Sequence, residues 1–179
     1  MSLNVGRVLL AEQTASADAT LDFDNVFDST YDIYEIEIIG VVPGTDNQIF
    51  EFKLGTGATP TYQTTLYDWS ASITAANASI TIVEREAVAD AHVELSSGSG
   101  VGNGSGESIS CTIKLYSLSN AALRTLGSYN SIFLTAAASQ TGSTYGHFTR
   151  QANEAHTSCR FEFASGNVAS GTIKVYGVR

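Results

Sequence analysis

Three histidines, His92, His147 and His156, are the side chains best suited to proton transfer near neutral pH. A serine hydrolase would need one of them beside a serine on a sharp Gly-x-Ser-x-Gly turn. Residues 102–106 read Gly-Asn-Gly-Ser-Gly, which places the glycines in the wrong register for that motif. We therefore expect no catalytic residues, and we expect that the chain is not an enzyme.

Carboxylates recur at short spacing in two places. Asp22, Asp24 and Asp28 have the spacing of ligands in a calcium loop, but apolar residues interrupt them and no glycine supplies the sharp turn. Glu35 and Glu37 would stand about 7 Å apart on one face of a strand. A solvated strand face explains this second pair better than an acid–base pair does. We expect no metal and no cofactor.

The stretch 96–106 (SSGSGVGNGSG) is rich in glycine and serine. A phosphate-binding loop would add a Lys-Ser or Lys-Thr pair and would open a helix, and neither feature is present. The composition is typical of a flexible loop. Strand-like runs flank it, so the sequence predicts a long hairpin loop here.

Aromatic residues gather beside Pro60, at Tyr62, Tyr67 and Trp69. Exposed aromatic rings can stack on sugars or anchor a protein interface. The same three rings could instead form an edge of the core. Both interpretations remain open from the sequence.

The two cysteines, Cys111 and Cys159, stand at apolar positions of strand-like runs. Buried free thiols are the simpler interpretation, because cysteine behaves as a small hydrophobic residue. A disulfide would need neighbouring strands and an oxidising compartment. The spacing of cysteines and histidines matches no metal motif.

The elements that must position these residues are strands, because apolar and polar residues alternate with a period of two. The clearest runs are 34–38, 50–54, 113–115, 161–163 and 173–175, and turn residues lie at 43–47 and 165–167. The only helical candidate, 84–91, is short and rich in alanine, and could equally be a loop. Weaker strands are expected near 7–12, 20–23, 62–67, 79–83, 92–96, 129–135 and 145–149.

About ten short strands in 179 residues predict one all-β domain. The expected fold is a jelly-roll-like, antiparallel two-sheet β-sandwich. Residues 1–12 would form an N-terminal arm or edge strand, and residues 13–179 would form the sandwich, with the flexible loop at 96–106.

The charge argues against nucleic-acid binding. The net charge is −9, and residues 1–55 hold ten acidic against two basic side chains. Nucleic-acid binding needs a basic surface. The N-terminus has no apolar signal sequence and no apolar run approaches the length of a membrane span, so we expect a protein made in the cytoplasm with no membrane contact.

Three blocks resemble a broad group of small phage and prophage proteins. The clearest is 165–178 (SGNVASGTIKVYGV), which resembles the C-terminal "SGN-x-x-SGTI(K/R)LYG" pattern of that group. Residues 27–36 (FDSTYDIYEI) resemble its early strand, and 42–47 (VPGTDN) resemble the turn that follows. The three blocks agree in order and spacing over most of the chain, while residues 60–110 match only loosely.

The resemblance implies a non-enzymatic structural component of a bacteriophage virion with a β-sandwich fold. We expect a capsid decoration, or cement, protein that binds the major capsid protein or other virion proteins and forms a homo-oligomer such as a trimer. An arm such as residues 1–10 could reach a neighbouring subunit. The alternative is a tail or fibre module that binds host-surface glycan. The candidate interface residues are Met1, Leu3, Val5, Tyr62, Tyr67 and Trp69.

Overall fold

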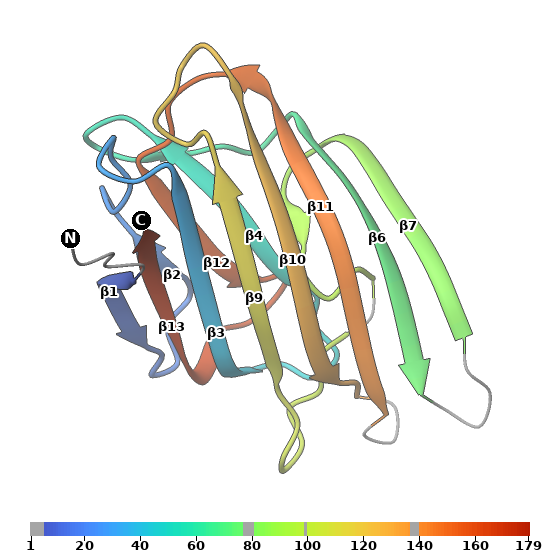
Figure 1. Cartoon of the computed structure of the whole chain (residues 1–179). Coiled ribbons are helices and arrows are strands. Elements are labelled where there is room, and N and C mark those ends of the chain that lie inside the picture. The colour runs from blue at the N-terminus through green and yellow to red at the C-terminus, as the bar shows by residue number, and fades with distance from the viewer. Residues whose placement is uncertain (1–5, 77–80, 99, 137–139) are drawn as a thin grey trace.

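The chain folds into two antiparallel β-sheets that pack face to face (Figure 1). The structure is a computed structural model that describes residues 6–76, 81–98, 100–136 and 140–179. The large sheet has the order β1-β13-β3-β9-β10-β11-β6-β7. Its strands are β1 (Arg7–Thr14), β3 (Ile33–Pro43), β6 (Tyr67–Ala76), β7 (Thr81–Asp90), β9 (Ile109–Tyr116), β10 (Arg124–Leu134), β11 (Thr141–Asn153) and β13 (Val168–Val178).

The small sheet has the order β2-β12-β4-β5, and β8 also pairs with β4. Its strands are β2 (Leu21–Phe23), β4 (Phe50–Thr56), β5 (Thr61–Tyr62), β8 (Val93–Glu94) and β12 (Ser158–Phe163). The chain passes repeatedly from one sheet to the other, which confirms the predicted all-β, jelly-roll-like sandwich. None of the described residues lies in a helix, so this part of the chain has no helix that could span a membrane.

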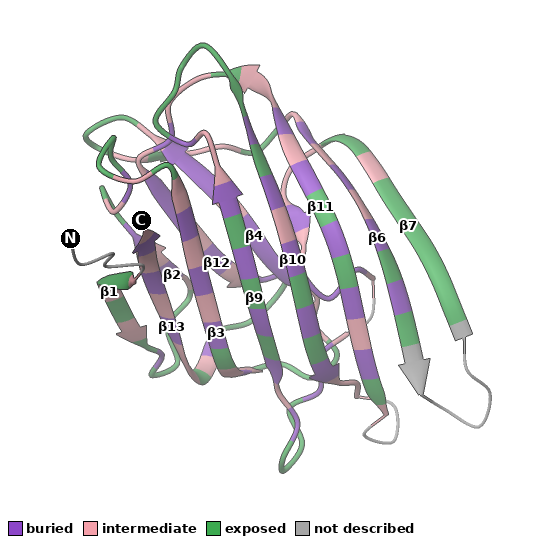
Figure 2. Cartoon of the chain, viewed as in Figure 1, coloured by how far each residue is buried: buried purple, intermediate pink, exposed green. Residues whose placement is uncertain are grey.

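The alternation seen in the sequence becomes the two faces of each sheet (Figure 2). In β3, Tyr34, Ile36 and Ile38 are buried, whereas Glu35 and Glu37 point away from the core. The same pattern holds along β9 and β13 and over Cys159–Phe163 of β12, whereas in β4 Glu51 is buried together with Phe50 and Phe52. All five of the clearest predicted strand runs are therefore confirmed. A one-residue shift in any of them would expose its whole apolar set, so burial fixes the register.

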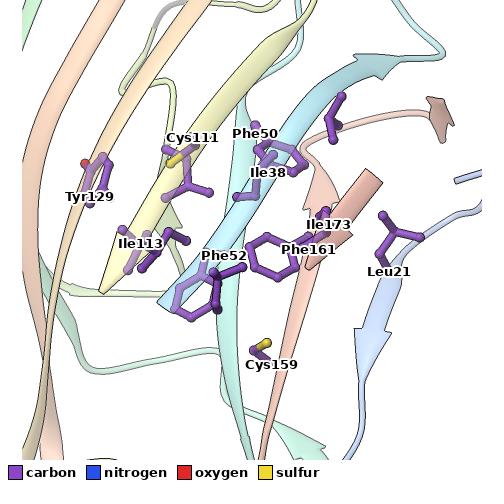
Figure 3. Packing of buried hydrophobic residues seen from close by; sticks show 14 of the residues in the cluster. Leu21, Ile38, Phe50, Phe52, Cys111, Ile113, Tyr129, Cys159, Phe161 and Ile173 are labelled. Atoms are coloured by element: carbon purple, nitrogen blue, oxygen red, sulfur yellow. The ribbon is translucent and has the colours of Figure 1, made fainter. Parts of the chain in front are cut away.

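Phenylalanine rings of the small sheet fill the middle of the sandwich (Figure 3). Phe161 on β12 lies between Phe50 and Phe52 of β4, with ring centroids 6.0 and 5.2 Å away, and Phe23 of β2 meets its edge at 6.1 Å. Phe52 also contacts Phe148 of the large sheet, at 5.6 Å. This cluster joins the two sheets.

Glycines make room for aromatic rings along β10 and β11. Tyr129 stands directly across from Gly146, and a Cβ atom at Gly146 would collide with its ring. Phe148 covers Gly127 in the same way, and Phe133 covers Gly142. An aromatic ring lying flat over a strand glycine restores the packing that the missing side chain would supply.

Both cysteines are buried free thiols, one in each sheet. Cys111 lies in β9 and Cys159 in β12. Burial raises the pKa of Cys111 to about 12 and raises that of Cys159 well above its ordinary value. The thiolate is the reactive form, so both side chains are held in the unreactive state.

We accordingly expect neither thiol of the folded protein to react with a thiol reagent such as DTNB at pH 8. In the unfolded protein both thiols should react. Absorbance of the released thiolate over an hour, with and without guanidinium chloride, measures this. Rapid release in native buffer would contradict the burial of the two thiols.

Residues 84–90 of the helical candidate 84–91 instead form part of strand β7. β7 pairs with β6 from Tyr67↔Asp90 to Ala75↔Thr81, and backbone pairing along this length overrides the helical preference of its alanines. The pairing is interrupted by a bulge near Trp69, and Ala89 has a positive φ of 57°. The helix prediction was wrong.

The glycine-rich stretch 96–106 is not a hairpin loop, because it carries the chain from β8 in the small sheet to β9 in the large one. Ser96 Oγ accepts the Phe50 N–H at 3.1 Å, and Val101 exchanges two backbone hydrogen bonds with Gln48. A side chain at Gly100 would collide with Asn47, so close backbone approach accounts for that glycine.

The start of the described chain is an edge strand. β1 pairs with β13 from Arg7↔Val178 to Thr14↔Thr172, and the Arg7 guanidinium pairs with Glu35 and Glu37 of β3. Residues 7–12 thus take the edge-strand alternative of the two that the sequence offered for residues 1–12. Residues 1–5 lie outside the described part of the chain.

Candidate functional site

Two of the three aromatic residues singled out from the sequence belong to the core. Tyr67 is fully buried and Trp69 is 5% exposed. The Tyr67 hydroxyl accepts the Leu54 N–H at 2.7 Å, and Trp69 Nε1 donates to Asp90 Oδ2 at 3.1 Å. Neither ring can stack on a ligand, so the interpretation of these two as exposed aromatics is wrong and the core-edge interpretation is right. β6 begins at Tyr67, at the end of the weak strand that the sequence predicts near 62–67.

The third aromatic residue, Tyr62, is half-buried and already has partners. Its hydroxyl donates to Asp24, and the Arg160 guanidinium lies 4.1 Å from its ring centroid. Arg160 in turn binds Asp22 through two nitrogens, at 2.7 and 2.6 Å. The remaining candidates, Met1, Leu3 and Val5, lie outside the described residues.

The carboxylates with calcium-like spacing have separate partners. Asp22 binds Arg160, Asp24 accepts from Tyr62, and Asp28 accepts the Thr30 N–H at 2.7 Å. Within the described ranges, no group of three or more His, Cys, Asp or Glu side chains is placed to hold a metal ion. Hydrogen bonds from the backbone and side chain of Thr30 keep the pKa of Asp28 below its ordinary value.

Glu35 and Glu37 form an ion-pair network on the outer surface of the large sheet. Both carboxylates pair with Arg7, and Lys114 Nζ lies 3.8 Å from Glu35. The hydrogen bond from Arg7 lowers the pKa of Glu37, whereas an acid catalyst would need a raised pKa. The ion pairs of Arg7 with both carboxylates hold the β1 edge against β3.

His156 forms an arrangement that resembles a catalytic triad but is sealed from solvent. Its Nδ1 lies 2.9 Å from Thr125 Oγ1, and its Nε2 lies 3.3 Å from Glu154 Oε1. Thr125 is fully buried and His156 is 1% exposed. Arg150 holds Glu154 at 2.6 Å and points toward the ring of Tyr67. A substrate cannot reach the threonine, so this network is structural.

Burial lowers the pKa of His156 to about 4. As pH falls below 6.5 the unfolded chain binds a proton at this histidine and the folded chain does not, so stability decreases with acidification. We expect the loss between pH 6.5 and 4 to be about 3 kcal/mol for this residue. Denaturation at pH 7 and pH 4.5, comparing wild type with His156→Gln, measures it.

The matched control is His147→Gln, because His147 is exposed on β11. The free energy of unfolding of His147→Gln should depend on pH as that of the wild type does. His156→Gln should be less stable than the wild type at pH 7, and its stability should decrease less as the pH falls. Equal pH dependence in wild type and His156→Gln would contradict the burial of a neutral imidazole.

An accessible surface lies on the outer face of the large sheet, near its β7 edge. Register places Tyr145 of β11 beside Ser72 of β6, and Ser72 beside Glu84 of β7. A second row, offset by two residues, consists of His147, Ser70 and Glu86. We call the hollow that these six residues line, together with Ala71 and Arg85, the β6 trough. Its volume is about 590 Å³.

The β6 trough continues along β6 into a second hollow of about 340 Å³ that shares Ser70, Glu86 and His147. Leu126 of β10 and Val88 of β7 line this part, and both are largely exposed. The trough therefore has a polar end with two carboxylates, an imidazole and a phenol, and an apolar end with aliphatic side chains.

The β6 trough contains a serine–histidine pair, since Ser70 Oγ and His147 Nε2 are 3.1 Å apart. Acyl transfer would also require free N–H donors at the developing oxyanion. Ser70 stands in mid-strand, where β6 pairs with β11 on one side and β7 on the other. The backbone donors around Ser70 serve those ladders, so the pair is better suited to orienting the imidazole than to nucleophilic attack.

Sequence reasoning did not find the β6 trough, although part of its signal was present. Residues 143–149 alternate strictly between buried and more exposed positions, which marks Tyr145 and His147 as an outward pair. Neither the partner strands nor their register can be read from local patterning. Glu84 and Glu86 were hidden by the helical interpretation of 84–91.

The chain matches no protein-family model and no curated protein. One solved structure with weak similarity is a GlcNAcα1-4Gal-releasing endo-β-galactosidase from Clostridium perfringens, at 12% identity and a TM-score of 0.22. The alignment covers 86% of this chain and 41% of that enzyme, so the chain spans about two fifths of its length. A similarity of this size carries no argument about function.

Proposed function

We propose that this chain is a non-enzymatic structural protein of a phage-type virion that decorates the head shell, and that it attaches through its β1 edge. The observation that carries the proposal is this open edge. β1 is the last strand of the large sheet, and on its free side it pairs with no strand in the described part of the chain. An unpaired strand edge is a ready site for a strand of another protein.

The surface of β1 supports such a contact. Leu9 is 50% exposed and Val8 is 42% exposed, on opposite faces of the strand. The Arg7 network with Glu35 and Glu37 holds this end of β1 in place. Met1, Leu3 and Val5 precede β1 in the sequence, and the proposed interface includes these apolar residues. The occupant of the edge in this proposal is a strand of the major capsid protein.

The segment that resembles small phage proteins supplies the strand on which β1 rests. Residues 168–178 form β13, between β1 and β3. Gly171 has a φ of 114°, and a side chain there would meet Val41. Ile173 and Val175 are fully buried. The residues that carry the resemblance thus serve packing and turn geometry in this fold.

A decoration protein acts by mass action. A protein that binds the assembled shell but not its separate subunits stabilises the shell in proportion to the occupied sites. A homo-oligomer such as a trimer would place several β1 edges on a repeating lattice, so that modest single contacts combine into firm attachment. No chemical step is needed.

The test is binding of the purified protein to heads that lack it, followed by co-sedimentation. We expect the wild type to saturate the heads and Leu9→Asp to bind about tenfold more weakly or worse, because a charge would be desolvated in the interface. The matched control is Val88→Asp, an exposed apolar position on the opposite edge strand, β7. It should bind heads like the wild type.

Failure of the wild type to bind heads would overturn the decoration role. Equal binding by Leu9→Asp and wild type would overturn the assignment to the β1 edge. The alternative, a tail or fibre module that binds host glycan through Tyr67 and Trp69, has no support from those two residues because both are buried.

A further inference from the structure

We infer that the β6 trough binds a neutral, hydroxyl-rich ligand, a glycan chain, between the Tyr145–His147 wall and the Glu84–Glu86 wall. This goes beyond attachment to the head and does not depend on it. The trough lies at the β7 edge of the large sheet, while the proposed attachment is at the β1 edge. Seven strand spacings separate the two edges, or about 34 Å, so both could be occupied together.

The trough has a floor of small side chains and two taller walls. Ser70 and Ser72 form the floor on β6, with Tyr145 and His147 on β11 to one side. The backbones of β11 and β7 are two strand spacings apart, about 10 Å. The two rows of three residues are separated by two positions along the strands, or about 7 Å. These dimensions suit an extended chain of rings lying along β6.

The side chains offered to a ligand match the groups of a sugar. The Glu84 and Glu86 carboxylates accept charge-assisted hydrogen bonds from hydroxyl groups. The Ser72 hydroxyl can donate or accept. Tyr145 is 66% exposed, and its ring can pack against the C–H face of a sugar. The Ser70 hydroxyl fixes the ring of His147 at 3.1 Å.

Charge selects against acidic ligands. The only arginine on β7, Arg85, is paired with Ala71, whose side chain faces the core, so Arg85 stands on the face opposite to Glu84. Its guanidinium packs beside Gly98, where an added Cβ atom would collide with it. Arg85 also lines the hollow, but its guanidinium lies on the Gly98 side, so the polar wall presents the Glu84 and Glu86 carboxylates to a ligand. Phosphate-bearing, sulfated or sialylated ligands would be repelled.

A peptide fits this surface less well than a glycan does. An extended peptide binds a sheet mainly through backbone hydrogen bonds at an open edge. The trough instead lies on the sheet face, over β6, whose backbone groups pair with β11 and β7. Only side-chain groups are available there. The aliphatic end, at Leu126 and Val88, would suit a methyl-bearing substituent of the glycan.

The test uses a printed array of neutral and acidic oligosaccharides, followed by titration calorimetry with the strongest neutral binder. We expect binding to neutral oligosaccharides only, with a millimolar or tighter dissociation constant. Tyr145→Ala and the double variant Glu84→Gln/Glu86→Gln should each weaken it about tenfold or more. The matched control is Ile132→Ala, an exposed apolar position on the same sheet face outside the trough.

Four results would overturn the inference. These are no binding to any neutral oligosaccharide at about 10 mM, preference for acidic ones, unchanged affinity in Tyr145→Ala, or carboxylate-dependent binding of an oligolysine peptide in place of sugar. Circular dichroism and thermal melting of each variant separate loss of binding from loss of fold. Head binding by Tyr145→Ala should be unchanged, so failure of this inference is distinguishable from failure of the proposed function.

Discussion

Phe161→Ala is expected to lower the free energy of unfolding by about 3–5 kcal/mol. Phe161 is fully buried, and its ring contacts Phe23, Phe50 and Phe52 from three directions. Its truncation would open a cavity between β12 and β4, whose backbones are fixed by six paired positions, so the site cannot readily collapse. The total free energy of unfolding of a typical domain is only about 5–15 kcal/mol.

Urea denaturation followed by intrinsic fluorescence measures this loss as a shift of the midpoint at constant m-value. Phe161→Leu, which keeps most of the volume, should cost about 1–2 kcal/mol. Leu126→Ala is the surface control, because Leu126 is 54% exposed, and it should change stability by no more than about 0.5 kcal/mol. A loss of under about 1 kcal/mol in Phe161→Ala would contradict a close-packed cluster.

Gly146→Val should destabilise the protein by about 3 kcal/mol, by a different mechanism. The valine Cβ would occupy the space of the Tyr129 ring, which covers Gly146 across the β10–β11 pair. Moving that ring breaks the bonds of its hydroxyl, which donates to the Glu94 carbonyl at 2.9 Å and lies 3.1 Å from Ser97 Oγ. Overpacking and the unsatisfied buried groups each cost about 1–3 kcal/mol.

The control for Gly146→Val is Asn130→Val, one position along β10 from Tyr129 but on the outer face, opposite Tyr145. It introduces the same residue type into the same strand pair without a ring above it, and valine has a favourable strand preference. Its stability should stay within about 0.5 kcal/mol of wild type. If Gly146→Val and Asn130→Val lost the same free energy of unfolding, strand propensity and not the Tyr129 ring would determine stability at Gly146.

The strands of the sandwich core could be predicted because their signal is local. In β3 and β13 the alternation of apolar residues with Glu35, Glu37 or Lys174 records which side faces the core. That signal fails at β7, where most described positions are exposed and where the strand is recognised only through its pairing with β6. Edge strands bury little, so their composition says little about their conformation.

The candidate site could not be predicted because it depends on contacts between distant segments. The β6 trough joins residues near 71, 85 and 146, and only the strand order β11-β6-β7 brings them together. Tyr67 and Trp69 show the same limit. The sequence left an exposed position and a core-edge position open for both rings, and burial against Arg150 and Asp90 places both in the core.

The two proposals assign separate binding surfaces to the two ends of the large sheet. The β1 edge would attach the protein to the particle, and the β6 trough near the β7 edge would face outward and contact glycan. A sandwich suits this arrangement because its core fixes the separation of the two edges. Leu9→Asp and Tyr145→Ala should then act independently, each impairing one activity and sparing the other.

Location in the particle is the most direct test of a decoration role. A cryo-EM map of the purified virion whose genome encodes this chain should show the sandwich repeated over the outer surface of the head, with β1 against the shell. Density for the sandwich in the tail alone, or its absence from the particle, would contradict the proposal.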